Sequence, residues 1–201
     1  MGNELFDNIP SRVSDLLSDV RNGRIGLPDL QSPFVWKDNK VRELLDSMMK
    51  GYPIGYIMLW ASPENYENTA HIGKNDKLYK QPDDLVIDGQ QRLTALLGAL
   101  YGVSIKDKNY KERNIRISYN PLTREFAVWT QAYERNQEWI SSISSVFKDH
   151  KDFNIAKFRK TFIKNCNENR IKNGIDILTE DEEDLIESNI NALLNLETYS
   201  L

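Results

Sequence analysis

Three stretches of the chain place apolar residues at the spacing of an amphipathic helix. Positions i, i+3, i+4 and i+7 of such a helix share one face, which can be buried. The three stripes are Val13, Leu16, Leu17 and Val20; Val41, Leu44, Leu45 and Met48; and Leu93, Leu96, Leu97 and Leu100. Gly23, Gly51 and Gly102 follow the stripes and indicate where the helices end. Ser11 and Asp38 are the expected N-caps of the first two helices.

Short apolar runs between these helices predict strands. The segment 24–36 is expected to be extended, because Pro28 and Pro33 exclude a helix there. Strands are expected at 56–60, 85–87, 115–119 and 125–129, and the last two flank a turn, as in a hairpin. The polar stretch 61–84 has little period and predicts a long loop.

The last third of the chain is predicted to be helical. Thr179, with Glu182 three residues later, forms the capping-box pattern that opens a helix. A change in composition near residue 135 divides the chain into an α/β part, 1–135, and a helical appendage, 136–201. The appendage could begin a further domain of a longer protein. The expected fold class is therefore α+β.

Composition narrows the class of protein. The chain has 201 residues, of which 40% are hydrophobic and 28% are charged, which excludes a disordered or fibrous chain. It contains neither a signal-peptide pattern nor an apolar run of about 18 residues, so we expect no membrane segment. A single cysteine, Cys166, cannot form an internal disulfide, and this favours a cytoplasmic location. His71 and His150 lack the neighbours that a zinc site requires.

Charge gives a weaker indication of partners. The net charge of −4 excludes a basic footprint over the whole chain, although local patches remain. Two basic groups either contact DNA backbone or are solvated surface. They are Lys106, Lys108, Lys111, Arg113, Arg116 and Arg124, and Lys157, Arg159, Lys160 and Lys164.

The segment LVIDGQQRLTALLGAL carries the clearest chemistry. A buried strand enters a tight turn at Asp88 and Gly89, and a helix leaves it through Gln90 and Gln91. The first N–H groups of a helix have no internal acceptor, and the helix dipole attracts an anion to them. Arg92 adds a fork of donors that matches phosphate oxygens. The pattern predicts an anion site.

Other interpretations of the same residues stay open. Asp88 and Gln91 also fit a capping box, in which Asp88 accepts from the first-turn amides and Gln91 reaches back. The chain contains no GxxxxGK[ST] loop, so a P-loop is excluded. Trp36 and Tyr52 either stack on a base or belong to the core, and Gly55 either lets the backbone approach a ligand or simply forms a turn.

Three blocks of the sequence, LPDLQSPFVW, KVRELLDSMMKGYPIGYIMLW and LVIDGQQRLTALLGALYG, resemble the N-terminal domain of GmrSD-type restriction enzymes, the domain of unknown function 262. The resemblance covers residues from about 10 to about 130. It implies a ParB/sulfiredoxin-like core in which a Gly-x-x-Arg box binds nucleotide phosphates. Gly89, Gln90, Gln91 and Arg92 fall on that box.

The resemblance also implies roles for individual residues. A nucleoside triphosphate (ATP, GTP or CTP) would bind with Mg²⁺ and be hydrolysed. Gln31 and Thr94 would join the box in binding it, Asp88 would hold the metal, and Asp88, Gln91 and Arg92 would serve catalysis. Family members carry Gln-Arg where this chain has Gln31-Ser32, so hydrolysis would need another arginine, such as Arg24 or Arg42.

Such proteins act in phage defence, recognising modified DNA and cleaving it through an HNH-type nuclease domain. This chain encodes no such nuclease, so the expected partners are nucleotide, DNA and a nuclease domain or subunit elsewhere. A second copy of the chain is a further candidate partner, and no membrane is expected. Two other functions stay open: a DNA-binding module without NTPase activity, and a degenerate domain kept for assembly.

Overall fold

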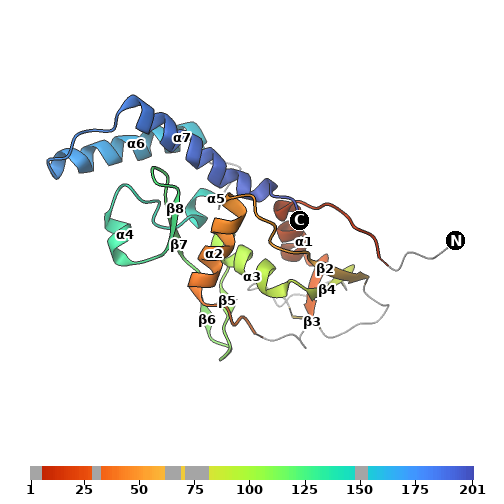
Figure 1. Ribbon diagram of the computed structural model, residues 1–201. Coiled ribbons are helices and arrows are strands. Elements are labelled where there is room, and N and C mark those ends of the chain that lie inside the picture. The colour runs from red at the N-terminus through yellow and green to blue at the C-terminus, as the bar shows by residue number, and fades with distance from the viewer. Residues whose placement is uncertain (1–5, 29–32, 62–68, 71–81, 148–153) are drawn as a thin grey trace.

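The computed structural model describes residues 6–28, 33–61, 69–70, 82–147 and 154–201, and its architecture is α+β, as predicted (Figure 1). The helices are α1 (Val13–Arg21), α2 (Asp38–Met49), α3 (Gln90–Tyr101), α4 (Gln131–Arg135), α5 (Ser144–Phe147), α6 (Ile155–Lys172), α7 (Glu180–Leu194) and the 3₁₀ helix η1 (Asn195–Thr198). The strands are β1 (Ile25–Pro28), β2 (Met58–Ala61), β3 (Thr69–Ala70), β4 (Asp84–Asp88), β5 (Ile105–Lys106), β6 (Glu112–Arg113), β7 (Ile117–Asn120) and β8 (Glu125–Val128).

The main sheet has four described strands in the order β2-β4-β1-β3. β1 and β4 are parallel, whereas β2 pairs antiparallel with β4 and β3 pairs antiparallel with β1. Figure 1 shows this sheet at one end of the molecule, with α3 leading away from it. β4 lies between β2 and β1 in the sheet. α3 begins just after β4, with Gly89 between the two elements.

The three predicted amphipathic helices are confirmed. Every residue of their stripes is buried, and all belong to one hydrophobic cluster. α3 is buried from Leu93 to Leu100, which is what a helix apolar on all sides requires. The predicted strand at 85–87 and the predicted hairpin are also confirmed, since β7 and β8 pair antiparallel from Ile117↔Val128 to Asn120↔Glu125.

Two predicted N-caps are wrong. α1 and α2 are preceded by Arg12 and Lys37, and neither residue makes a side-chain cap bond. Asp38 instead lies in the first turn of α2, where its carboxylate still faces the positive end of the helix dipole. The predicted helix ends are confirmed, because Gly23, Gly51 and Gly102 all have the positive φ of a residue that terminates a helix.

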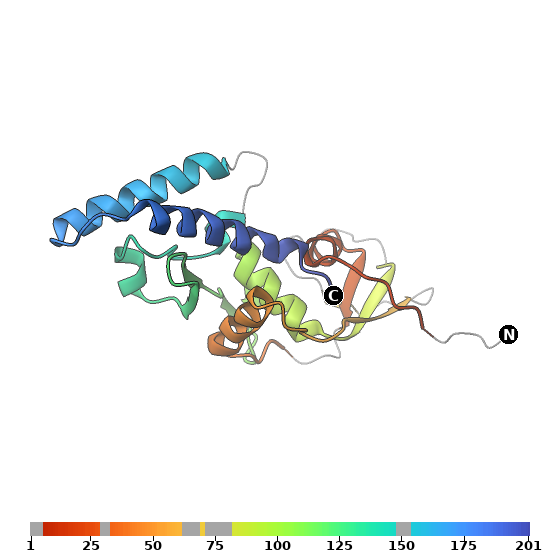
Figure 2. The same ribbon diagram turned by 45° about the horizontal axis from the view of Figure 1, so that its top comes forward.

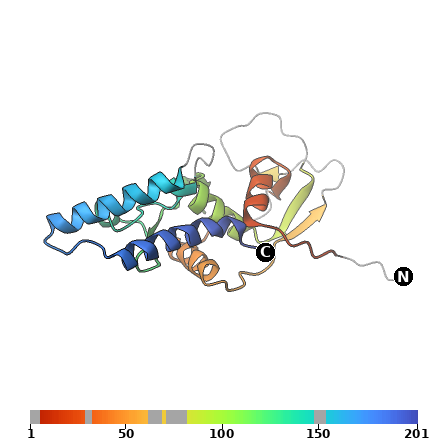
Figure 3. The same cartoon turned by 90° about the horizontal axis from the view of Figure 1, so that it is seen from above.

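α6 and α7 form an antiparallel helical hairpin alongside the rest of the molecule (Figures 2 and 3). The predicted capping box is present: Thr179 accepts from the backbone N–H of Glu182, and the Glu182 side chain accepts from that of Thr179. The Arg159 guanidinium ion-pairs with the Glu187 carboxylate across the two helices at 3.2 Å.

The hairpin shares its core with the α/β part. Ile186, Ile190 and Leu193 of α7 lie in the same buried cluster as residues of α1 and α3. Buried Asn189 donates to the Pro121 carbonyl at 2.8 Å, which joins α7 to the β7–β8 turn. The boundary near 135 and the ParB/sulfiredoxin-like assignment stay predictions. None of the described helices is both long and apolar enough to cross a membrane.

Candidate functional site

The turn between β4 and α3 is built around Gly89. Its φ is +94°, in the left-handed region, and its backbone precedes the first turn of α3. A Cβ at this position would collide with Cδ1 of Ile57. The backbone conformation therefore favours glycine here, and any other residue would also displace the end of the Ile57 side chain.

Arg92 lies in the first turn of α3 and is held by two neighbours. Its Nη1 donates to the Ile54 carbonyl at 2.8 Å, and its Nη2 lies 3.2 Å from Oδ2 of Asp88. The Arg92 side chain is only 16% exposed, whereas that of Asp88 is 73% exposed. A pair with such an exposed carboxylate contributes little stability, so an incoming anion can replace Asp88 at small cost.

Gly55 makes room for the Arg92 guanidinium. A Cβ at residue 55 would lie 2.6 Å from Nη1 of Arg92, and the φ of Gly55 is +85°. The turn 52–55 therefore supplies both a carbonyl acceptor and the space beside it. The sequence left Gly55 either as a close approach to a ligand or as a plain turn. In the structure, the group beside Gly55 is the arginine of the same chain.

Gln91 does not complete a capping box. Its Oε1 accepts from the Val35 N–H at 3.0 Å, and its Nε2 donates to the Pro33 carbonyl at 3.2 Å. The N-cap residue of α3 is Gly89, which has no side chain to accept from the first-turn N–H groups. Gln91 instead binds the extended segment 33–35 in the manner of a neighbouring strand. Its predicted catalytic role stays a prediction, and Gln31 lies outside the described residues.

The segment that Gln91 binds has a second anchor. Nη2 of Arg113 donates to the Trp36 carbonyl at 2.7 Å and lies 3.2 Å from the Asp38 carboxylate. The Lys40 ammonium lies 4.2 Å from the centre of the Trp36 ring, so a cation of the chain already occupies one face of that ring.

The remaining predicted residues lie at different depths. Gln90 is half-buried at the start of α3, and Thr94 is 8% exposed within the buried part of the helix. Tyr52 is 60% exposed and is the first residue of the turn 52–55, which contacts Arg92. Gly89, Gln90 and Arg92 thus come together with Asp88 at one helix end, and Thr94 is set back from its surface.

The described residues contain no group of three or more side chains that could hold a metal ion by themselves. The Asp88 carboxylate is exposed and lies at the helix end that would receive an anion. Mg²⁺ in proteins often binds through one or two carboxylates together with substrate phosphates and waters. The donor set at this site therefore fits a magnesium ion that arrives with a nucleotide, and not a protein cage.

Cys166 is excluded as a nucleophile by its surroundings. It is 1% exposed, and its thiol donates to the Gln137 carbonyl at 2.9 Å. Burial raises the pKa of this thiol to about 12, so the reactive thiolate is absent near neutral pH.

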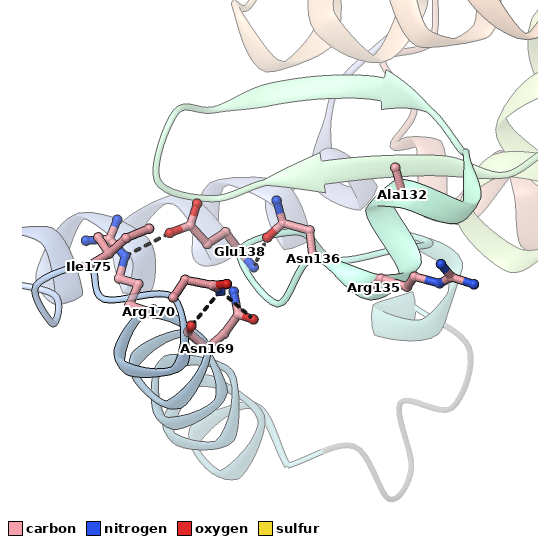
Figure 4. A pocket seen from close by; sticks show the side chains of 8 residues that line it. Ala132, Arg135, Asn136, Glu138, Asn169, Arg170 and Ile175 are labelled. Atoms are coloured by element: carbon pink, nitrogen blue, oxygen red, sulfur yellow. Dashed lines mark hydrogen bonds and ion pairs between the residues drawn. The ribbon is translucent and has the colours of Figure 1, made fainter.

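A hollow of about 340 Å³ lies between α4 and the end of α6 (Figure 4). Arg170 lines this hollow and is only 13% exposed. The Arg170 Nε donates to the Glu138 carboxylate at 2.8 Å. Figure 4 shows Arg135 pointing away from that pair. The Arg170 and Glu138 charges at this hollow therefore already satisfy each other.

The basic residues divide into paired and exposed groups. Arg113, Arg116 and Arg159 face partners of their own: Arg113 pairs with Asp38, Arg116 stacks 3.8 Å from the Trp129 ring centre, and Arg159 pairs with Glu187. The exposed group around β5 and β6 comprises Lys106, Lys108 and Lys111.

Comparison with known proteins finds a family match over nearly the whole chain. A family model described as the GmrSD restriction endonuclease, N-terminal domain, matches residues 13–199. An uncharacterized protein of Methanocaldococcus jannaschii is 35% identical over 102 residues, which cover 47% of this chain and 18% of the relative. The chain thus spans about a fifth of the length of that relative.

Proposed function

Because the chain belongs to the family of GmrSD restriction endonuclease N-terminal domains, we propose that it binds a nucleoside triphosphate at the start of α3 and acts in a restriction system against phage. The nuclease that it regulates would lie in another domain or subunit. The observation that carries the proposal is the Arg92 guanidinium, only 16% exposed, in the first turn of α3 beside an exposed Asp88 carboxylate.

The phosphates would bind by replacing the Asp88 carboxylate as a partner of Arg92. The first-turn N–H groups of α3, from Gly89 onward, donate to phosphate oxygens, and the helix dipole favours their negative charge. Arg92 keeps its bond to the Ile54 carbonyl and turns its remaining donors from Asp88 to the phosphate. The parallel β1–β4 pair leading into α3 also supports the ParB/sulfiredoxin-like core that forms part of this proposal.

Magnesium would accompany the nucleotide. Asp88, released from Arg92, is the carboxylate that would hold it. When bound, the ion neutralises phosphate charge and so favours transfer of the terminal phosphoryl group.

Hydrolysis would follow from the same geometry. Water attacks the terminal phosphorus, the bond to the bridging oxygen breaks, and the products are the nucleoside diphosphate, inorganic phosphate and a proton. Arg92 stabilises the negative charge that develops on the leaving phosphate. Arg24 and Arg42 already pair with Asp19 and Glu43 and would have to leave those partners to contribute.

Calorimetric titration with ATP, GTP, CTP and UTP, each with and without Mg²⁺, tests the proposal. We expect saturable, metal-dependent binding of at least one nucleotide, weakened roughly tenfold or more in Arg92→Ala because a charge-assisted fork to phosphate is lost. Arg92→Lys keeps the charge without the fork and should lie between the two.

Lys50→Ala provides a matched control. Lys50 is a surface cation that pairs with Asp46 on α2, and its loss should leave nucleotide affinity unchanged. If the folded wild-type chain binds none of the four nucleotides, the proposal is overturned. If Arg92→Ala binds as tightly as wild type, the phosphate site lies elsewhere.

One observation favours DNA binding as a second candidate function. The β5–β6 hairpin exposes Lys106, Lys108 and Lys111, together with Tyr110, which is 75% exposed. Lysines beside an exposed aromatic ring suit contact with a nucleic-acid backbone. Affinity for duplex DNA that falls steeply with salt would support this function, and affinity indifferent to salt would exclude it.

A further inference from the structure

The last residues of the chain, 195–201, connect four parts of the molecule, and we refer to them as the C-terminal segment. Figure 3 shows this segment beside α1. Ser11 and Leu201 exchange two backbone hydrogen bonds, and the Val13 N–H donates to the Tyr199 carbonyl at 3.0 Å. The Tyr101 hydroxyl, at the end of α3, donates to the Glu197 carboxylate at 2.7 Å. The segment is thus fixed to α1 and α3 and continues directly from α7.

The Tyr199 side chain reaches the turn that holds Arg92. Its hydroxyl donates to the Tyr52 carbonyl at 2.6 Å, across 147 positions of the sequence. Two residues beyond Tyr52, the Ile54 carbonyl accepts from Arg92 at 2.8 Å. Tyr199, which follows α7 and η1, is therefore connected to the Arg92 guanidinium through the turn 52–55.

Among the described residues, the turn 52–55 is also held by Ile54, whose side chain packs against the hydrophobic core. Pro53 has no N–H to donate, and Gly55 has the conformational freedom that its φ of +85° requires. Tyr52 is bonded through its N–H to the Ser47 carbonyl at the end of α2. The bond from Tyr199 is a second, independent restraint on the same residue.

We propose that Tyr199 is a positioning residue of the Arg92 site, and that the C-terminal segment couples α7 to phosphate binding. The proposal rests on the function proposed above. Because coupling between two sites is reciprocal, nucleotide at α3 stabilises the Tyr199–Tyr52 contact, and displacement of α7 weakens nucleotide binding. The position of the α6–α7 hairpin then depends on whether nucleotide is bound, and a domain or partner in contact with the hairpin responds to that position.

Two matched variants test the coupling, because each removes one tyrosine hydroxyl whose hydrogen bond joins the C-terminal segment to another part of the molecule. In Tyr199→Phe the bond to the 52–55 turn is lost, and we expect affinity for Mg²⁺-bound ATP, GTP, CTP or UTP, whichever wild type binds, to fall roughly three- to tenfold. In Tyr101→Phe the bond to Glu197 is lost while the Tyr199–Tyr52 bond is kept, so the melting temperature should fall with affinity close to that of wild type.

Amide hydrogen exchange supplies a readout that does not require nucleotide. Exchange at residues 52–56 should accelerate in Tyr199→Phe and stay as in wild type in Tyr101→Phe. In a Gly55→Ala background, where Arg92 is already displaced, Tyr199→Phe should cost little further affinity, whereas a merely structural tyrosine would give additive effects.

The outcomes separate the two proposals. A wild-type chain that binds no nucleotide overturns the proposed function, and exchange at 52–56 still decides whether Tyr199 restrains the turn. Nucleotide binding that is equal in wild type and Tyr199→Phe leaves the proposed function standing and overturns the coupling. Unchanged exchange at 52–56 overturns it as well.

Discussion

Gly55 determines where the Arg92 guanidinium lies. Replacing it with alanine introduces a Cβ at 2.6 Å from Nη1, so the guanidinium must shift from its position beside the Ile54 carbonyl. We expect Gly55→Ala to lower nucleotide affinity roughly tenfold, measured by calorimetry. The left-handed φ of residue 55 adds a cost of about 1 kcal/mol to folding.

Gly51→Ala separates these two effects. Gly51 has a φ of +73° but no atom within 4 Å of a Cβ, so its replacement carries similar backbone strain without touching Arg92. The two variants should lose comparable stability, and only Gly55→Ala should lose nucleotide affinity. Equal affinities in the two variants would show that the position of Arg92 does not matter for binding.

At the scale of elements, α7 depends on its N-terminal capping box. Thr179 accepts from the Glu182 N–H, and the bond that the Glu182 carboxylate receives from the Thr179 N–H lowers the pKa of that carboxyl. Since the folded-state pKa lies below the unfolded one, this contribution is present at neutral pH and disappears as acid protonates Glu182.

Thr179→Ala should therefore destabilise the protein by about 1 kcal/mol, because an N-cap acceptor is lost. Chemical denaturation at pH 7 measures the change. Thr161→Ala, on the exposed side of α6, is the control and should be neutral or slightly stabilising, since alanine has the higher helix propensity. A neutral Thr179→Ala would mean that tertiary packing alone holds the start of α7.

At the scale of the whole molecule, a single hydrophobic cluster joins the two predicted parts. Ile186 and Ile190 of α7 are 1% and 0% exposed and belong to the same cluster as Val13 and Leu17 of α1. We expect a fragment of residues 1–135 to lose cooperative thermal unfolding, followed by circular dichroism, because it exposes the apolar surface that α7 covers.

A chain that begins at residue 10 is the corresponding control. Phe6 and Ile9 are 83% and 72% exposed, so removing the residues before Pro10 should leave the melting temperature nearly unchanged. Cooperative unfolding of the 1–135 fragment would instead establish it as an independent domain, as the change in composition near residue 135 suggested.

Local patterns were enough to predict the elements that carry the site. The period of apolar residues located α1, α2 and α3, and the residue order alone located the turn at Gly89, because helices and tight turns depend on neighbours within a few positions. The shortest elements, such as β5, β6 and α5, span two to four residues and leave no such period.

The use of each side chain at the site was decided by tertiary structure. The sequence by itself determined that a glycine and an arginine stand at the start of a buried helix. It could not determine that Gln91 binds residues 33 and 35, that Arg92 donates to Ile54, or that Tyr199 reaches Tyr52. These partners lie 38 to 147 positions apart in the sequence. Contacts at such separation follow from how the packed elements meet, which no local pattern encodes.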